Sequence, residues 1–339
     1  MSDKILIISP SWIGDCVMSQ PMLRRLHELR AGCQIDVFAP KWSQAVYARM
    51  PEVSEILDNP FGHGTLQLRE RWRVGRELGK RGYTQVIVLP GPLKSAIVAV
   101  ATGAKRRTGW VGEMRYGLLN DARKLDKTAL YLMVDRYTAL AHDNLADFTG
   151  SDYPRLQVNE VAQQNALTQY NLHHNQPILA LCAGAEFGTA KRWLPEHYAA
   201  TAQHYLQQGW QVWLFGSPKD FDVSEQINQQ AGGTCVNLCG KTSLADAIDL
   251  LSCVDSVVGN DSGLMHLSAA LGRKLVAVYG STDPKHAPPL SDVARLTSLN
   301  LDCSPCVQRD CPLGHHDCMR KLMPERVIGL LDELNNQNK

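Results

Sequence analysis

Residues 259–272 carry the residue types of a phosphate-binding turn. A buried-strand pattern ends at the start of this segment, and an amphipathic helix pattern follows it. Asp261 and Ser262 are of the types that cap a helix N-terminus, and Gly263 lets a ligand approach the backbone closely. The N–H groups and dipole of a helix start attract anions, and His266 would face the same anion one turn further on. An ordinary capped turn would have the same sequence, so other segments must support the interpretation.

Asp15 is the first of these other groups. It follows Gly14 in a loop, residues 10–15, that comes directly after the first predicted strand. A carboxylate in this position can act as a general base that takes the proton of an attacking hydroxyl. The alternative is that Asp15 only caps the following helix.

Lys191 and Arg192 supply positive charge near Thr189, at the end of a glycine-containing loop that follows another predicted strand. Two cations and a hydroxyl suit a diphosphate, although a basic surface loop would have the same composition. Asp220 follows the predicted strand 210–215, where a carboxylate can hold ribose hydroxyls.

These groups sit in an alternation of short apolar runs and helical patterns, which predicts doubly wound parallel α/β sheets. Ligands of such sheets bind at the carboxyl ends of the strands. The predicted strands are residues 4–9, 34–38, 55–57, 85–89, 177–181, 210–215 and 274–279, and the predicted helices are residues 17–30, 66–81, 195–208, 221–230 and 244–251.

The strand signal lapses over residues 151–176, where polar residues dominate. We therefore expect a first domain over residues 1–165 and a second over residues 166–322. An amphipathic helix over residues 323–339 follows and needs an apolar surface, which one interpretation places on the first domain.

Composition narrows the class of protein. The chain has 339 residues, 44% of them hydrophobic, a mean hydropathy of −0.22, and no apolar run of the roughly 20 residues that cross a bilayer. Its ten scattered cysteines favour reduced thiols in the cytosol over a disulfide framework. Residues 1–150 carry a net charge of +6 and the remainder −5, so the first half should favour an anionic partner. No G-x-G-x-x-G follows the first strand, which disfavours a dinucleotide oxidoreductase.

Taken together, the motifs resemble glycosyltransferase family 9, the bacterial lipopolysaccharide heptosyltransferases. The resemblance runs from the first strand to the last helix. The opening segment and the cysteine-rich segment resemble the type II enzymes of the family in particular. The segments that carry it are residues 10–20, 185–193, 260–266 and 303–318.

The resemblance implies a GT-B fold, with two Rossmann-like domains facing across a cleft. It implies transfer of L-glycero-D-manno-heptose, with inversion, from ADP-heptose to the heptosyl-Kdo2-lipid A inner core. Asp15 would be the general base, and Lys191 would neutralise the departing diphosphate. Ser262 is a departure from the type I enzymes, which usually have Thr there. The implied donor-binding residues are Gly14, Thr189, Arg192, Asp220, Asp261, Ser262, Gly263, Leu264 and His266.

Three alternatives stay open: type I transfer to Kdo2-lipid A, another nucleotide-sugar enzyme such as an epimerase, and a binding module without catalysis. The recognised motifs offer only Asp15 as an acid or base, whereas an epimerase needs several such groups. A binding module has no need of Asp15.

The acceptor would carry carboxylates and phosphates at an anionic membrane leaflet, so we expect Arg106, Arg107 and Arg115 to bind it. The basic helix 66–81 would meet the cytoplasmic face of the inner membrane, making the protein cytoplasmic and peripheral. Nucleic acid is not an expected partner.

No cofactor and no metal are expected. Cys303, Cys306, Cys311 and Cys318, with two adjacent histidines, nevertheless keep a structural zinc as an alternative to plain reduced thiols.

Overall fold

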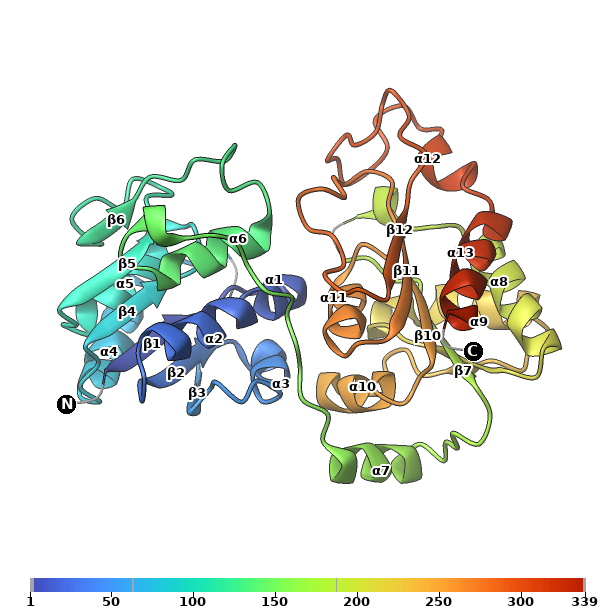
Figure 1. The fold of residues 1–339 in the computed structure, drawn as a ribbon, viewed down its shortest axis with the longest axis horizontal. Helices are drawn as coiled ribbons and strands as arrows, with labels where there is room; N and C mark the ends of the chain where they lie inside the picture. The colour runs from blue at the N-terminus through green and yellow to red at the C-terminus, as the bar shows by residue number, and fades with distance from the viewer. Residues whose placement is uncertain (1–2, 63, 187, 338–339) are drawn as a thin grey trace. The chain divides into compact units, whose positions relative to one another are not determined.

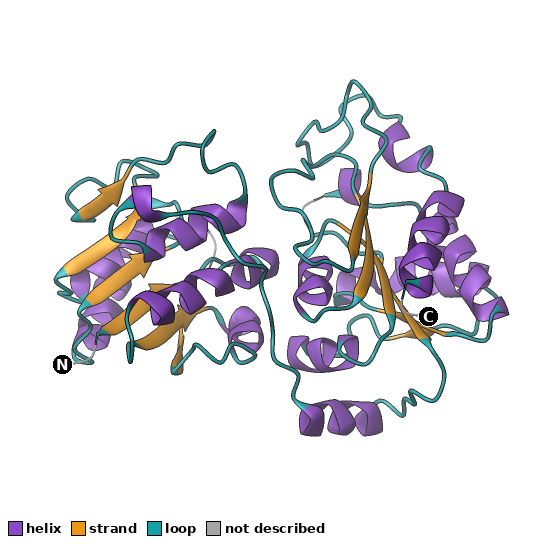
Figure 2. Ribbon diagram, viewed as in Figure 1, coloured by secondary structure: helices purple, strands orange, loops and turns teal. Residues whose placement is uncertain are grey.

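The computed structural model describes residues 3–62, 64–186 and 188–337. It divides into two compact units, Met1–Pro154 and Arg155–Lys339. In the residues described, each unit is built on a six-stranded parallel sheet with helices packed against it (Figures 1 and 2). The predicted pair of Rossmann-like α/β domains is confirmed.

The first sheet has the strand order β3-β2-β1-β4-β5-β6. Strand β1 lies between β2 and β4, and its apolar residues are buried because helices cover the sheet. The strands are β1 (Lys4–Ile8), β2 (Gln34–Ala39), β3 (Glu55–Asp58), β4 (Gln85–Val88), β5 (Arg106–Trp110) and β6 (Asp121–Arg123). The helices are α1 (Ile13–Met18), α2 (Gln20–Leu29), α3 (Gln44–Tyr47), α4 (Leu68–Gly79), α5 (Leu93–Ala101) and α6 (Met133–Thr138).

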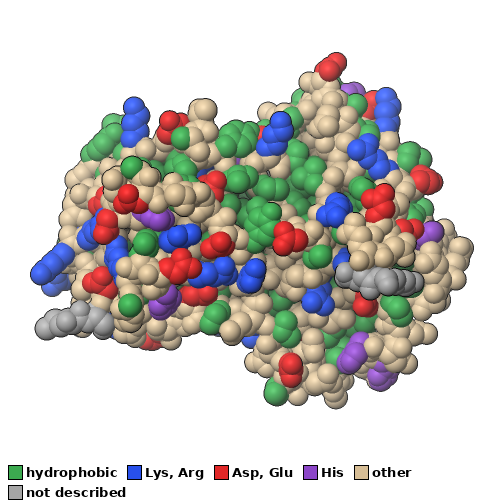
Figure 3. All heavy atoms as spheres, viewed as in Figure 1, with side chains coloured by type: hydrophobic (Ala, Val, Ile, Leu, Met, Phe, Trp, Pro, Cys, Tyr) green, Lys and Arg blue, Asp and Glu red, His purple; other side chains and the backbone are tan. Residues whose placement is uncertain are grey.

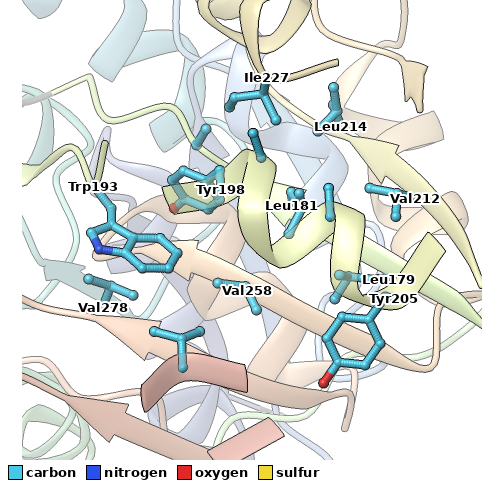
Figure 4. Close-up of a cluster of buried hydrophobic side chains, with 14 of the residues drawn as sticks. Leu179, Leu181, Trp193, Tyr198, Tyr205, Val212, Leu214, Ile227, Val258 and Val278 are labelled. Atoms are coloured by element: carbon cyan, nitrogen blue, oxygen red, sulfur yellow. The ribbon is translucent and has the colours of Figure 1, made fainter. Parts of the chain in front are cut away.

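The second sheet has the order β12-β11-β10-β7-β8-β9. Its strands are β7 (Ile178–Cys182), β8 (Gln211–Leu214), β9 (Val236–Asn237), β10 (Ser256–Asn260), β11 (Lys274–Val278) and β12 (Ala294–Thr297). Its helices are α7 (Glu160–Gln169), α8 (Pro195–Gln207), α9 (Phe221–Gln230), α10 (Leu244–Leu251), α11 (Gly263–Ala270), α12 (Asp317–Arg320) and α13 (Pro324–Asn336). One face of this sheet packs Val258 and Val278 against Trp193 and Tyr198 at the start of α8 (Figure 4).

The last helix belongs to the second unit. Helix α13 packs on β11 and α8, and it places Val327, Leu331 and Leu334 in the core of that unit. The interpretation that returned this helix to the first domain is therefore wrong. The apolar surface that it needs is supplied by its own sheet.

The linker region differs from the prediction. The division falls between Pro154 and Arg155, whereas the predicted boundary at residue 165 lies inside helix α7. This helix packs on α10 and so belongs to the second unit. Its sequence is mostly polar because only Ala166 and Leu167 are buried, which explains why no core pattern was visible.

Candidate functional site

The second unit holds Lys191 at the start of helix α11. The short 3-10 helix Thr189–Lys191 follows strand β7, and Asp261 follows the neighbouring strand β10. Lys191 Nζ lies 2.7 Å from Asp261 Oδ2, which also accepts a 2.6 Å hydrogen bond from the Thr282 hydroxyl. Both partners of the ion pair are largely buried. Asp261 therefore positions the cation, because its carboxylate would itself repel a phosphate.

Ser262 leaves a hydroxyl without a partner beside the same helix start. It is the N-cap of α11, yet its side chain makes no capping bond, and its buried Oγ has no hydrogen-bond partner among the described residues. Gly263 and Leu264, the first residues of the helix, are partly exposed. Buried polar atoms in folded proteins are normally bonded, so this hydroxyl and the adjacent N–H groups offer hydrogen bonds to an anion.

His266 lies one turn into α11 and is buried. Its pKa is lowered to about 4, chiefly by burial; the Asp261 carboxylate acts to raise the pKa, and the Lys191 ammonium acts to lower it. The imidazole is therefore neutral at pH 7. It can donate one hydrogen bond to a ligand without adding a positive charge.

Asn260 joins the loops that carry this site, and the sequence analysis assigned it no function. Its Oδ1 accepts hydrogen bonds from the Trp193 N–H at 2.9 Å and the Tyr198 hydroxyl at 3.0 Å. Its Nδ2 donates to the Ala183 carbonyl at 2.7 Å. The amide thus ties the ends of β7 and β10 to the start of α8. An asparagine at the buried end of an apolar strand was the signal available in the sequence.

The loop before Lys191 is fastened to the cysteine-rich segment. The Thr189 hydroxyl donates to Asp310 Oδ1 at 2.6 Å, and the Ala190 N–H donates to the Arg309 carbonyl at 2.9 Å. A Cβ on Gly188 would come within 2.2 Å of that carbonyl oxygen, so only glycine fits there. Phe187, part of the segment 185–193 that carries the family resemblance, lies outside the described residues.

Asp220 has a structural role in the chain. It is buried and accepts hydrogen bonds from the N–H and hydroxyl of Ser217 as the end of a capping box. Its carboxylate lies against Gly184, where a Cβ would come within 2.5 Å, and 3.8 Å from the Arg192 guanidinium. Ribose binding by Asp220 stays a prediction, as does donor binding by Arg192.

In the first unit, Asp15 lies in the opening turn of helix α1. The N-cap of this helix is Trp12, so the interpretation of Asp15 as the N-cap is wrong. Burial raises the pKa of Tyr137, on α6, well above its usual value, and the Asp15 carboxylate raises it further through its charge and a hydrogen bond. Tyr137 thus stays protonated and orients Asp15, a contact that no local pattern predicted.

Arg115 is fully buried, so its predicted contact with the acceptor is wrong. Its guanidinium donates to the carbonyls of Pro90, at 2.5 Å, and Trp110. Burial lowers the pKa of Arg115 to about 10. Through these two hydrogen bonds, Arg115 stabilises the loop after β5.

Arg106 and Arg107 are also engaged within the first unit. Arg106 lies 2.8 Å from the carboxylate of Asp121 and pairs with Asp143 as well. Arg107 donates to two backbone carbonyls, those of Leu118 and Ala104, each at 2.9 Å. These bonds give both residues a structural role, and their binding of the acceptor stays a prediction.

The cysteine segment shows no metal-site geometry. All ten cysteines are free thiols in the structure. In the part of the chain that the structure describes, no group of three or more His, Cys, Asp or Glu residues is arranged to hold a metal ion.

Comparison with known proteins gives close matches along the whole chain. The model of glycosyltransferase family 9 (heptosyltransferase) matches residues 71–316. Lipopolysaccharide heptosyltransferase 2 of Escherichia coli K12 is 44% identical, over 98% of this chain and 97% of the relative. Lipooligosaccharide heptosyltransferase 2 of Haemophilus influenzae is 42% identical, over 98% and 99%. The solved structure of E. coli ADP-heptose LPS heptosyltransferase II has a TM-score of 0.87 at 40% identity, over 99% of each chain.

Proposed function

Because the chain belongs to glycosyltransferase family 9, the heptosyltransferases, we propose that it moves L-glycero-D-manno-heptose from ADP-heptose to the heptosyl-Kdo2-lipid A inner core. It is a glycosyltransferase of lipopolysaccharide core biosynthesis with a GT-B fold. The high identity to relatives named heptosyltransferase 2 favours the type II acceptor. An epimerase or a simple binding module is not favoured.

The observation that carries the proposal is the group at the start of α11. Lys191, held by Asp261, supplies a positive charge, while Ser262 and His266 supply neutral hydrogen-bond donors. These groups match the diphosphate of ADP, on which negative charge grows as the glycosidic bond breaks. The set stabilises the leaving group through the protein's own side chains and helix dipole.

Asp15 then removes the proton of the acceptor. The acceptor hydroxyl oxygen attacks the anomeric carbon from the face opposite the diphosphate, so the configuration inverts. The bond between that carbon and the diphosphate oxygen breaks, and ADP leaves with the electron pair. The hydroxyl proton passes to the Asp15 carboxylate, which Tyr137 orients.

The test is to supply ADP-heptose with either heptosyl-Kdo2-lipid A or Kdo2-lipid A and to weigh the products. One added heptose on the heptosylated acceptor, with little product from the other, supports type II transfer. Product from Kdo2-lipid A alone would assign the type I reaction. Free ADP without any heptosylated product would refute a transferase.

For the membrane, we propose contact through the outer face of helix α4. Leu68, Trp72 and Arg76 follow each other at helical spacing and are exposed, as is Arg69. Apolar and aromatic side chains among cations are typical of helices that lie on anionic lipid. None of the described helices is long and apolar enough to cross a bilayer.

A further inference from the structure

The loops at the carboxyl end of the first sheet share a feature that is separate from the arginines expected to bind the acceptor. Each of the loops after β1, β2, β4, β5 and β6 exposes at least one large hydrophobic side chain. The residues are Trp12, Trp42, Leu93, Met114, Tyr116 and Tyr131. Ligands of parallel sheets bind at this edge, and exposed apolar groups gathered there indicate a binding surface.

Trp12 lies on the same helix turn as Asp15, and Trp42 is bonded to the loop that leads into this helix. Trp12 is the N-cap of α1 and Asp15 is its third residue, so their side chains are neighbours on the first turn. Trp42 follows the adjacent strand β2, and its indole N–H donates to the Ser11 carbonyl at 3.0 Å. The two indoles are 50% and 47% exposed.

From this placement we propose that Trp12 and Trp42 form a stacking platform for the acceptor's terminal sugar. The proposal rests on the proposed function. The attacking hydroxyl must come within hydrogen-bond reach of the Asp15 carboxylate, so the pyranose ring that bears it lies against the first turn of α1. Its C–H face packs on the indole faces, while the polar edge of Trp42 is already bonded to Ser11. The indoles orient the sugar, and Asp15 takes its proton.

The test uses Trp12→Ala and Trp42→Ala in the full-length protein, with KM and kcat measured separately for donor and acceptor. We expect KM for the acceptor to rise on the order of tenfold in each variant, which corresponds to about 1.4 kcal/mol. KM for ADP-heptose should stay unchanged. Trp12→Phe and Trp42→Phe keep an aromatic face and should recover most of the loss. Tyr153→Ala, another exposed aromatic of the first unit, is the matched control.

If the indoles bind the sugar, their effect on KM must persist when the acyl chains of the acceptor are removed. The same increases in KM are expected with an acceptor saccharide freed of its acyl chains. If the increases vanish with that saccharide, the indoles contact acyl chains and the proposal is wrong. A change in donor KM, or an unchanged acceptor KM in both alanine variants, would equally overturn it.

A binding measurement separates this proposal from the transfer reaction itself. The deacylated saccharide should change the intrinsic fluorescence of the parent and of Trp72→Phe, but much less that of the double variant Trp12→Phe with Trp42→Phe. That result supports the platform even if the parent transfers no heptose, an outcome that would refute the proposed function alone. An identical fluorescence change in that double variant refutes the platform even if transfer is normal.

Discussion

At the scale of single residues, the role of Asp15 as the general base is a proposal that one substitution can test. Asp15→Asn keeps the shape of the side chain but removes the proton acceptor, so kcat should fall about 10²–10⁴-fold. ADP-heptose affinity, measured by calorimetry, should stay near that of the parent, because the groups proposed to bind the diphosphate, Lys191, Ser262 and His266, lie on the second unit. Tyr137→Phe, which removes only the orienting hydroxyl, should cause a smaller loss. Turnover close to normal in Asp15→Asn would leave Asp15 without a catalytic role.

Substitutions at Lys191 test the proposed binding site for the leaving group, ADP. Lys191→Ala should weaken ADP binding and also lower kcat, because the charge on the diphosphate increases in the transition state. Lys191→Arg keeps the charge and should retain part of both. EDTA should leave the parent's rate unchanged. A rate lost in EDTA and restored by magnesium would show that a metal ion does the work assigned to Lys191.

His266 links stability to pH. Its pKa is about 4 in the folded protein and about 6.5 when unfolded, so between these values the unfolded chain binds more protons. The stabilisation is complete above pH 6.5 and is lost as pH falls toward 4, by up to about 3 kcal/mol. Urea unfolding across this window should show a weaker pH dependence in His266→Gln than in the parent. His173→Gln, at an exposed site, should match the parent.

At the scale of elements, the parts predicted correctly were those whose signals are local. The predicted helix 244–251 is present as α10, where Ser243 and Asp246 form a capping box, and the turn at Ser262 begins a helix as expected. Strand β5 was missed because its sequence, Arg106–Trp110, begins with two arginines, which bond to Asp121 of strand β6 and to the Leu118 carbonyl in the loop before it. The predicted helix over residues 17–30 is interrupted at Ser19, between α1 and α2.

For the candidate site, too, the sequence indicated the local features and missed those that depend on tertiary packing. Residue types and spacing located Lys191 and Ser262, since both lie in loops after apolar strands. The contact of Asp15 with Tyr137, from residues far along the chain, follows only from tertiary packing. The burial of Arg115 also depends on packing, and its charge alone suggested an exposed position.

A substitution at Asn260 tests whether its amide holds the ends of β7 and β10 against the start of α8. Asn260→Ala would leave the buried partners of three hydrogen bonds unsatisfied, each costing about 1–3 kcal/mol. We expect the free energy of unfolding to fall by about 3 kcal/mol or more. ADP affinity should fall too, because the strand ends would lose their common tie. Asn175→Ala, in an exposed loop, is the control. Normal stability in Asn260→Ala would show that the three bonds rearrange without cost.

At the scale of the whole molecule, residues 1–150 carry a net charge of +6. Figure 3 shows basic and acidic side chains interspersed over the face in view. On α4 itself, Arg73 pairs with Glu70, and Lys80 pairs with Glu77. Arg69 and Arg76 are exposed on the same helix, next to Trp72.

These two arginines test the proposed membrane contact. Each cation near anionic lipid is worth about 1 kcal/mol, so Arg69→Gln with Arg76→Gln should weaken co-sedimentation with phosphatidylserine-containing vesicles roughly thirtyfold. Rising salt should weaken binding of the parent more than that of the variant, because screening acts only on charges still present.

A second double variant shows whether vesicle binding depends on where the positive charge is removed or only on how much is removed. Lys285→Gln with Arg326→Gln removes the same charge from exposed sites on the second unit. If α4 is the membrane-binding element, this control keeps the parent's affinity for the vesicles. Equal losses in both double variants would mean that net charge alone draws the protein to the lipid. A parent that binds neutral and anionic vesicles equally would leave α4 as a solvated face, since its arginines would then contribute nothing to the attraction.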